Sequence, residues 1–97
     1  MNGNNRELTL ASILRMIYTM AWDRFQYGQE REALAEDAFL PTDRRVLIAL
    51  LRAAETNLEY AETALVNRPK TADQSEIQHW ETVIYVIKEQ MKRASYR

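Results

Sequence analysis

The 97-residue chain contains no cysteine and has only two glycines and two prolines. Without cysteine, it can have no disulfide framework, no thiol nucleophile and no thiolate metal site. A sheet of short strands needs glycine and proline at its turns, so their scarcity argues against a β-rich fold. The only glycines, Gly3 and Gly28, do not form a phosphate-binding loop. A single histidine and no cysteine also leave no Cys–His pair for catalysis. We therefore expect a helical protein that is not an enzyme.

The chain also lacks a long hydrophobic run and an excess of charge of one sign. Its most apolar stretch, residues 8–21, is interrupted by Ser12, Arg15 and Thr19, whereas a membrane-spanning helix needs about 20 apolar residues. The N-terminal residues lack the charged and then apolar profile of a secretion signal. Thirteen lysines and arginines against 14 acidic residues give a net charge of −1. We expect a soluble, cytoplasmic protein that binds no membrane, with residues 1–5 flexible.

The composition that remains is that of an ordinary folded protein. Apolar residues make up 46% and charged residues 28% of the chain, which argues against disorder. A chain of this length is at the small end of the range for one domain, and it buries about 60–68% of its unfolded surface. We expect a single helical-bundle domain over residues 1–97.

Apolar residues recur at helical spacing in three long segments. This periodicity predicts helices at about residues 6–27, 43–66 and 74–95. Beyond Gly28 the apolar register of the first helix is lost. Residues 30–38 therefore form either a separate short helix across the end of the bundle or a continuation of the first helix.

Polar residues mark the ends of the predicted helices. Pro41 and the pair Thr42-Asp43 precede the second long helix, and Asn67 to Pro69 follow it. Asp73 and Glu76 fit a capping box, in which the Asp73 side chain accepts from the amide of residue 76 and Glu76 reaches back. Because residues 67–72 are a short connection, the last two long helices must form an antiparallel hairpin. The expected fold is all-α: an antiparallel three-helix bundle with the first helix in the groove of the hairpin, and a possible short fourth helix after Gly28.

The first long helix is apolar over more of its surface than two neighbouring helices can cover. A helix at the edge of a small bundle needs only about 100° of apolar arc, and this one offers roughly twice that. Its apolar residues fall in three stripes: Leu10, Leu14, Ile17 and Ala21; Ile13, Met16 and Met20; and Tyr18, Trp22 and Phe25. We interpret the surplus as a surface for a protein partner.

Aromatic and methionine side chains are enriched at protein interfaces. The leading hypothesis is therefore a small non-catalytic regulatory, adaptor or subunit protein that acts through the first helix. The expected contact residues are Met16, Tyr18, Met20, Trp22 and Phe25, with Arg15, Asp23 and Arg24 at the rim. A homodimer with this helix at the two-fold axis, or membership of a larger complex, would cover the surface. This hypothesis needs no cofactor.

Four residues with metal-binding side chains support an alternative in which the protein is an enzyme. Glu59 and Glu62 share one flank of their helix, and an antiparallel hairpin brings Glu62 level with His79. Oxygen-rich sites suit Mg²⁺ or Mn²⁺. In the competing interpretation the carboxylates are solvated, Glu76 caps a helix and His79 is a partly exposed surface histidine.

Two families show a similar pattern of ligands. The run Glu59-x-x-Glu62, thirteen residues, then Glu76-x-x-His79 resembles the hairpin signature of the all-α nucleotide pyrophosphohydrolases of the MazG type. That resemblance implies carboxylates that hold magnesium on a nucleoside triphosphate, although the family has Asp where this chain has His79. The pair Glu76-x-x-His79 is also similar to the di-iron motif of ferritin-like bundles.

Cations near two helix ends suggest a second alternative, a nucleic-acid-associated subunit. The residues concerned are Arg44 and Arg45 near the start of the second long helix, and Lys88, Lys92 and Arg93 near the end of the last. Nucleic-acid-binding domains are usually strongly basic, whereas residues 68–97 carry an excess of only +2 (six cations minus four anions). Cations at a helix C-terminus also complement its dipole. We therefore do not expect nucleic acid to be the main partner.

Overall fold

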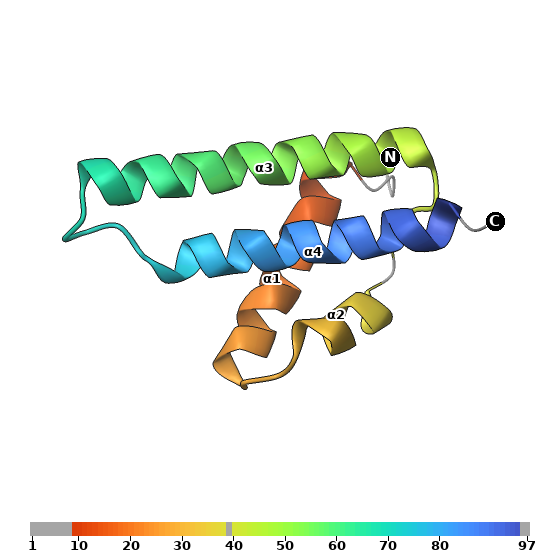
Figure 1. The fold of residues 1–97 in the computed structure, drawn as a ribbon, viewed down its shortest axis with the longest axis horizontal. Helices are drawn as coiled ribbons and strands as arrows, with labels where there is room; N and C mark the ends of the chain where they lie inside the picture. The colour runs from red at the N-terminus through yellow and green to blue at the C-terminus, as the bar shows by residue number, and fades with distance from the viewer. Residues whose placement is uncertain (1–8, 39, 96–97) are drawn as a thin grey trace, which may run out of the picture.

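The computed structural model describes residues 9–38 and 40–95, and this part of the chain contains four helices and no strand (Figure 1). The helices are α1 (Leu10–Gln26), α2 (Arg31–Asp37), α3 (Arg44–Asn67) and α4 (Ser75–Ser95). The predicted all-α fold with a short fourth helix after Gly28 is confirmed. None of the described helices is long and apolar enough to cross a membrane. The expectation of a flexible segment at residues 1–5 lies outside the described residues.

The first helix is shorter than predicted at its N-terminal end. Thr9 has an extended backbone, with φ −78° and ψ 162°, and its side chain accepts a hydrogen bond from the Ser12 amide. Thr9 is therefore an N-cap, and it stops the helix from extending back toward the predicted start at residue 6. Its hydroxyl satisfies one of the amides that a helix start leaves without an intrahelical partner.

Gly28 ends the first helix and separates it from α2. Its φ of +68° lies in the left-handed region that glycine adopts without strain. The Gly28 amide donates to the Phe25 carbonyl at 3.2 Å, and the Gln29 amide donates to the Arg24 carbonyl at 2.9 Å. This pair of bonds is a Schellman motif. The alternative of one continuous helix to Asp37 was therefore wrong.

The helices α3 and α4 form the predicted antiparallel hairpin (Figure 1). The Asp43 carboxylate accepts from the Arg45 amide at 2.9 Å and caps α3. At the start of α4, the Asp73 carboxylate accepts from the Ser75 amide at 2.9 Å and from the Ser75 hydroxyl at 2.7 Å. The predicted capping box was wrong in this detail, because the Asp73 side chain bonds to residue 75 and leaves the amide of Glu76 to the Asp73 backbone carbonyl.

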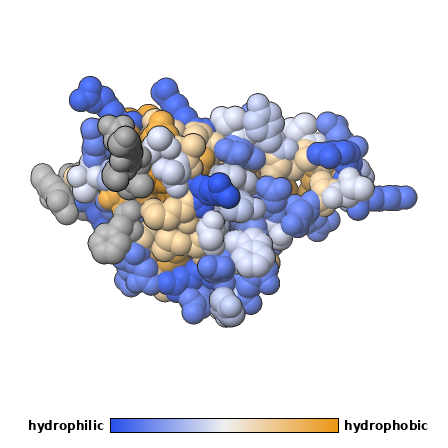
Figure 2. Space-filling model, turned by 180° about the vertical axis from the view of Figure 1, so that it is seen from behind, coloured by the Kyte–Doolittle hydropathy of each residue, from blue (hydrophilic) through white to orange (hydrophobic). Residues whose placement is uncertain are grey.

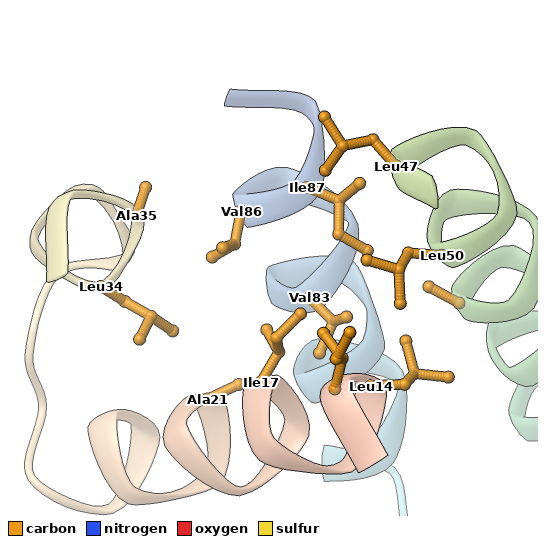
Figure 3. Packing of buried hydrophobic residues seen from close by; sticks show 12 residues of the cluster. Leu14, Ile17, Ala21, Leu34, Ala35, Leu47, Leu50, Val83, Val86 and Ile87 are labelled. Carbon is orange, nitrogen blue, oxygen red and sulfur yellow. The ribbon is translucent and has the colours of Figure 1, made fainter. Parts of the chain in front are cut away.

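The core is centred on α4, which packs against all three other helices. Val83 and Ile87 lie between the side chains of α1 and α3, whereas Val86 points toward α2 (Figure 3). The buried apolar residues are Ile13, Leu14, Ile17, Ala21, Leu34, Ala35, Leu47, Leu50, Ala54, Val83, Val86 and Ile87. All four helices contribute to this one cluster. Seen from behind, the surface shows a hydrophobic area between hydrophilic residues (Figure 2).

The helix α1 crosses the hairpin steeply instead of lying along its groove as predicted (Figure 1). Near the turn at residues 68–74, the hairpin consequently extends past α1. Leu58 and Leu65 in this part of α3 are only partly buried. Because α1 covers only one section of the hairpin, each end of α4 has a different set of neighbours.

The short helix α2 is held against α4 by polar contacts. The Arg31 guanidinium lies 4.5 Å from the centroid of the Tyr85 ring, within the range of a cation–π contact. The Arg93 guanidinium donates to the Ala35 carbonyl at 2.9 Å, which satisfies a carbonyl near the end of α2. The Gln90 amide donates to the Leu40 carbonyl at 3.3 Å. These contacts fix α2 and the connection to α3 beside the C-terminal half of α4.

Candidate interaction surfaces

An aromatic surface forms where α1 crosses the start of α4. Tyr18, Trp22 and Phe25 recur at helical spacing along one flank of α1. The Tyr18 ring packs against Trp80 of α4, with the ring centroids 4.7 Å apart and the planes tilted by 40°. We call Tyr18, Trp22, Phe25 and Trp80 together the aromatic patch. Aromatic pairs at such a separation are favourable beyond the area that they bury.

His79 lies directly beneath this patch. Its side chain is only 1% exposed, and Nε2 has no hydrogen-bond partner among the described residues. The imidazole meets the Tyr18 and Phe25 rings edge to face, at centroid distances of 5.5 and 5.2 Å. The interpretation of His79 as a partly exposed surface residue was therefore wrong. It belongs to the buried stripe of α4, four and seven residues before Val83 and Val86, and that spacing was the signal that could have placed it.

Burial dominates the electrostatics of this histidine. Loss of water around the ring lowers the pKa of His79 below its usual 6.5, because burial penalises the charged imidazolium. The carboxylates of Asp73 and Glu76 act in the opposite direction but do not overcome burial. The same three causes raise the pKa of Tyr18: burial first, then the negative charges of Glu76 and Asp73. The negative charges of Asp73 and Glu76 therefore act on Tyr18 and His79.

The patch leaves a large part of its apolar area in contact with solvent. Trp22 is 45% exposed and Phe25 is 46% exposed. Tyr18 and Trp80 are half-buried, since they also pack on the core. The predicted contact residue Tyr18 thus packs against an aromatic residue from a second helix, Trp80, which the sequence analysis did not include.

The other predicted contact residues of α1 lie away from this patch or have structural roles. Met20 is half-buried and lines a small hollow of about 190 Å³ with Asp23 and Arg24. Arg24 forms an ion pair with Asp37 at the end of α2. Arg15, Met16 and Asp23 are exposed. The apolar surplus of α1 is consequently divided between two flanks, and the aromatic flank is the one that meets α4.

Some exposed hydrophobic residues were not among the predicted contacts. Leu10 at the start of α1 and Tyr27 at its C-cap are exposed, as are Tyr60 and Val66 on α3. Tyr60 and Val66 lie on the section of α3 that extends past α1. Single exposed hydrophobic residues are normal on a protein surface, so we assign them no role.

The four candidate metal ligands do not converge. Glu59 and Glu62 are exposed on α3, whereas the His79 ring faces Tyr18 and Phe25 of α1. Within the described residues, no group of three or more His, Asp or Glu side chains could hold a metal ion. The convergence of Glu62, Glu76 and His79 that the metal-site alternative requires is therefore not found among the described residues. The physical reason is that His79 lies on the side of α4 that α1 covers.

The second candidate surface is a groove at the opposite end of α4. It has a volume of about 440 Å³ and is lined by Arg44 and Leu51 of α3 and by Lys88, Met91 and Lys92 of α4. We call it the cationic groove. It unites three of the five cations that the sequence analysis considered for nucleic acid. Of the other two, Arg45 is exposed on α3, and Arg93 donates to the Ala35 carbonyl.

Comparison of the chain with protein-family models, with curated proteins and with solved structures finds no significant match.

Proposed function

We propose that this chain is a small non-catalytic protein-interaction module that docks a helix of another protein on the aromatic patch. The observation that carries the proposal is the half-exposed pair Trp22 and Phe25, on the flank of α1 where Phe25 packs on the buried His79 and Tyr18 packs on Trp80. Large aromatic side chains supply much of the binding energy at protein interfaces. Trp22 and Phe25 remain about half exposed in the folded protein, so they are available to a partner.

The charges beside the patch favour a particular kind of partner. Asp73 and Glu76 lie near enough to Tyr18 and His79 to influence the pKa of both. A partner with apolar side chains flanked by lysine or arginine would meet aromatic rings at its centre and carboxylates at its rim. Such complementarity steers association and selects against acidic partners. Cations beside exposed tryptophan also gain a cation–π attraction.

The proposal can be tested with a defined probe. The probe is a fluorescent amphipathic peptide with leucine at positions i, i+3, i+4 and i+7 and lysine elsewhere, called the Leu–Lys peptide. Its binding is measured by fluorescence anisotropy. We expect Trp22→Ala and Phe25→Ala each to weaken binding by at least about tenfold, as for residues at the centre of an interface. The matched control is Tyr60→Ala, an exposed aromatic residue on α3 outside the patch.

Urea unfolding of the same variants separates docking from folding. If Trp22 is an anchor, Trp22→Ala lowers binding more than it lowers the free energy of unfolding. Equal losses would make Trp22 a core residue and refute its role as an anchor.

Light scattering over about a hundredfold range of protein concentration tests whether a second copy of this chain occupies the patch. A stable dimer that Trp22→Ala dissociates would show that the patch serves a second copy of this chain instead.

A further inference from the structure

The cationic groove contains apolar side chains as well as cations. Leu51 and Met91 line its base between the three cations. An adjoining hollow of about 290 Å³ shares Arg44 and Met91 with the groove and continues it toward Leu47 and Ala94. The surface is therefore a shallow, open depression with half-buried apolar residues and exposed cations around them. Methionine adapts its shape to different ligands, and it is common at such binding surfaces.

The helix dipole does not account for two of the cations. Arg44 is the first residue of α3, where the positive end of the helix dipole disfavours a cation. Lys88 lies seven residues before the end of α4, beyond the last turn in which the dipole favours a cation. Neither side chain forms an ion pair with another described residue. Lys92 donates to Glu89 at 3.0 Å and accordingly has a partner within its own helix.

The side chains that line the groove suit some classes of anionic ligand better than others. A nucleic-acid backbone is bound by clustered cations and polar groups, and it would gain nothing from the apolar floor formed by Leu51 and Met91. An anionic bilayer would approach as a broad surface and meet Glu89 beside Lys92, as well as Glu55, which follows Leu51 by one helical turn. A narrow ligand that has apolar side chains and carboxylates on one face avoids both costs.

We infer that the cationic groove binds an acidic amphipathic helix of a partner protein, with its apolar side chains on Leu51 and Met91 and its carboxylates on Arg44 and Lys88. Helix-in-groove recognition uses apolar anchors at i, i+3 or i+4, and i+7, which the groove along α3 and α4 can accept. Opposite charges at the sides of the groove set the orientation and the choice of partner. This surface is separate from the aromatic patch, so the chain would join two partners of opposite charge.

The test uses a fluorescent peptide with the same leucine spacing as the Leu–Lys peptide and glutamate in place of lysine, called the Leu–Glu peptide. We expect measurable binding to the wild-type protein by fluorescence anisotropy, with an affinity that falls as salt is raised. Lys88→Glu and Arg44→Glu should each weaken it at least about tenfold, because each replaces an attraction with a repulsion beside the ligand. Arg52→Glu is the matched control, since Arg52 is exposed on α3 and does not line the groove.

The floor of the groove is tested by Met91→Gln, which keeps the length of the side chain but makes it polar. We expect weaker binding of the Leu–Glu peptide and an unchanged salt dependence. A peptide with glutamate kept and every leucine replaced by serine should not bind. Equal binding of that peptide would reduce the groove to a general patch of positive charge and overturn the inference.

Three further outcomes would also refute the inference. The first is no binding of the Leu–Glu peptide at millimolar concentration, and the second is equal weakening by Arg52→Glu and Lys88→Glu. The third is tighter binding of a single-stranded oligonucleotide, or of vesicles with an anionic lipid, that Lys88→Glu abolishes. Trp22→Ala should leave the Leu–Glu peptide unaffected, and Lys88→Glu should leave the Leu–Lys peptide unaffected. Failure of one surface is thereby distinguished from failure of the other.

Discussion

The two ends of α4 are built from different chemistry although they belong to one helix. At its N-terminal end, His79 and Trp80 lie under the aromatic flank of α1, and the nearby charges are the carboxylates of Asp73 and Glu76. At its C-terminal end, aliphatic and methionine side chains lie between cations. Acidic residues at the start of a helix and basic residues at its end both complement the helix dipole. The dipole of α4 accounts for Glu76 in its first turn and Lys92 in its last turn, but it does not account for Arg44 and Lys88 at the cationic groove.

The comparison also shows how the neighbours of α4 shape each surface. The helix α1 crosses the N-terminal section and leaves half of Trp22 and Phe25 exposed. The helix α2 lies beside the C-terminal section, where Arg31, Gln90 and Arg93 hold it. Because the two ends share one core, a change in the core should affect both surfaces, whereas a change at either surface should affect only one.

The largest expected effect comes from the core that the two ends share. Ile17→Ala on α1 and Leu47→Ala on α3 each remove a fully buried side chain, which typically costs about 2–5 kcal/mol of stability. Both variants should lower the urea midpoint measured by circular dichroism and should shift the loss of both peptide-binding activities to lower urea. If the Ile17→Ala variant lost binding of the Leu–Lys peptide at a lower urea concentration than binding of the Leu–Glu peptide, the two ends of α4 would not unfold together.

Acidification should destabilise the protein through the buried histidine at the N-terminal end of α4. The pKa of His79 is lowered in the folded protein, so below pH 6.5 the unfolded chain binds more protons than the folded one. The contribution of His79 to the free energy of unfolding is fully present above pH 6.5. It declines as the pH falls from 6.5 toward the lowered pKa, by no more than about 1.4 kcal/mol per pH unit for one proton. Urea midpoints measured between pH 7.5 and 5 should show this decline.

The matched variant for this pH experiment is His79→Leu, which keeps an apolar contact with Tyr18 and Phe25 but cannot titrate. Its stability should be flat over the same range. Asp73 does not interfere, because hydrogen bonds from the Ser75 hydroxyl and amide lower the pKa of its carboxyl below the usual 3.8, and its contribution is lost only at lower pH. A wild-type stability that stayed constant or rose on acidification would contradict the role assigned to the buried ring.

Gly28 lies in the connection between α1 and α2, which contact opposite ends of α4. Its substitution should have an intermediate effect on stability. An alanine Cβ at this position would meet no atom within 4 Å, so the cost arises from the positive φ alone. A left-handed conformation costs a non-glycine residue roughly 1–2 kcal/mol. Gly28→Ala should lower the free energy of unfolding by about that amount. A loss near zero would show that the connection rearranges without strain.

The sequence was sufficient to predict the three long helices, because each carries a clear apolar periodicity and a polar boundary, whereas it left open whether residues 30–38 continue the first helix. Gly28, Asp43 and the Asn67–Pro69 segment each mark a boundary observed in the structure. The crossing of α1 was not predictable in the same way, since apolar stripes on a helix do not state the angle at which it packs. The burial of His79 followed from that crossing. The spacing of His79 to Val83 and Val86 places it on the buried stripe of α4, but it does not show which helix covers that stripe.

The candidate surfaces were predictable in part. The spacing of Tyr18, Trp22 and Phe25 identified one flank of α1, but Trp80 joins them only because α1 crosses α4 at this point. The cations were identified from the sequence as two groups far apart in the chain. Their convergence on Leu51 and Met91 depends on the register of the α3–α4 hairpin, and the apolar floor changes the class of ligand that they favour.

The smallest expected effect concerns the ion pair between Arg24 and Asp37, which ties the end of α1 to the end of α2. Ion pairs near a protein surface contribute about 0.2–1 kcal/mol, and salt screens them. Asp37→Asn should therefore reduce stability slightly in low salt and by less in 1 M salt, whereas Asp23→Asn, which breaks no ion pair among the described residues, should not. Neither variant should change peptide binding by more than about twofold, since both surfaces are held by other contacts. If Asp37→Asn instead weakened the Leu–Lys peptide strongly, the position of α1 over α4 would depend on α2, and the two ends of α4 would be coupled through the connection at Gly28.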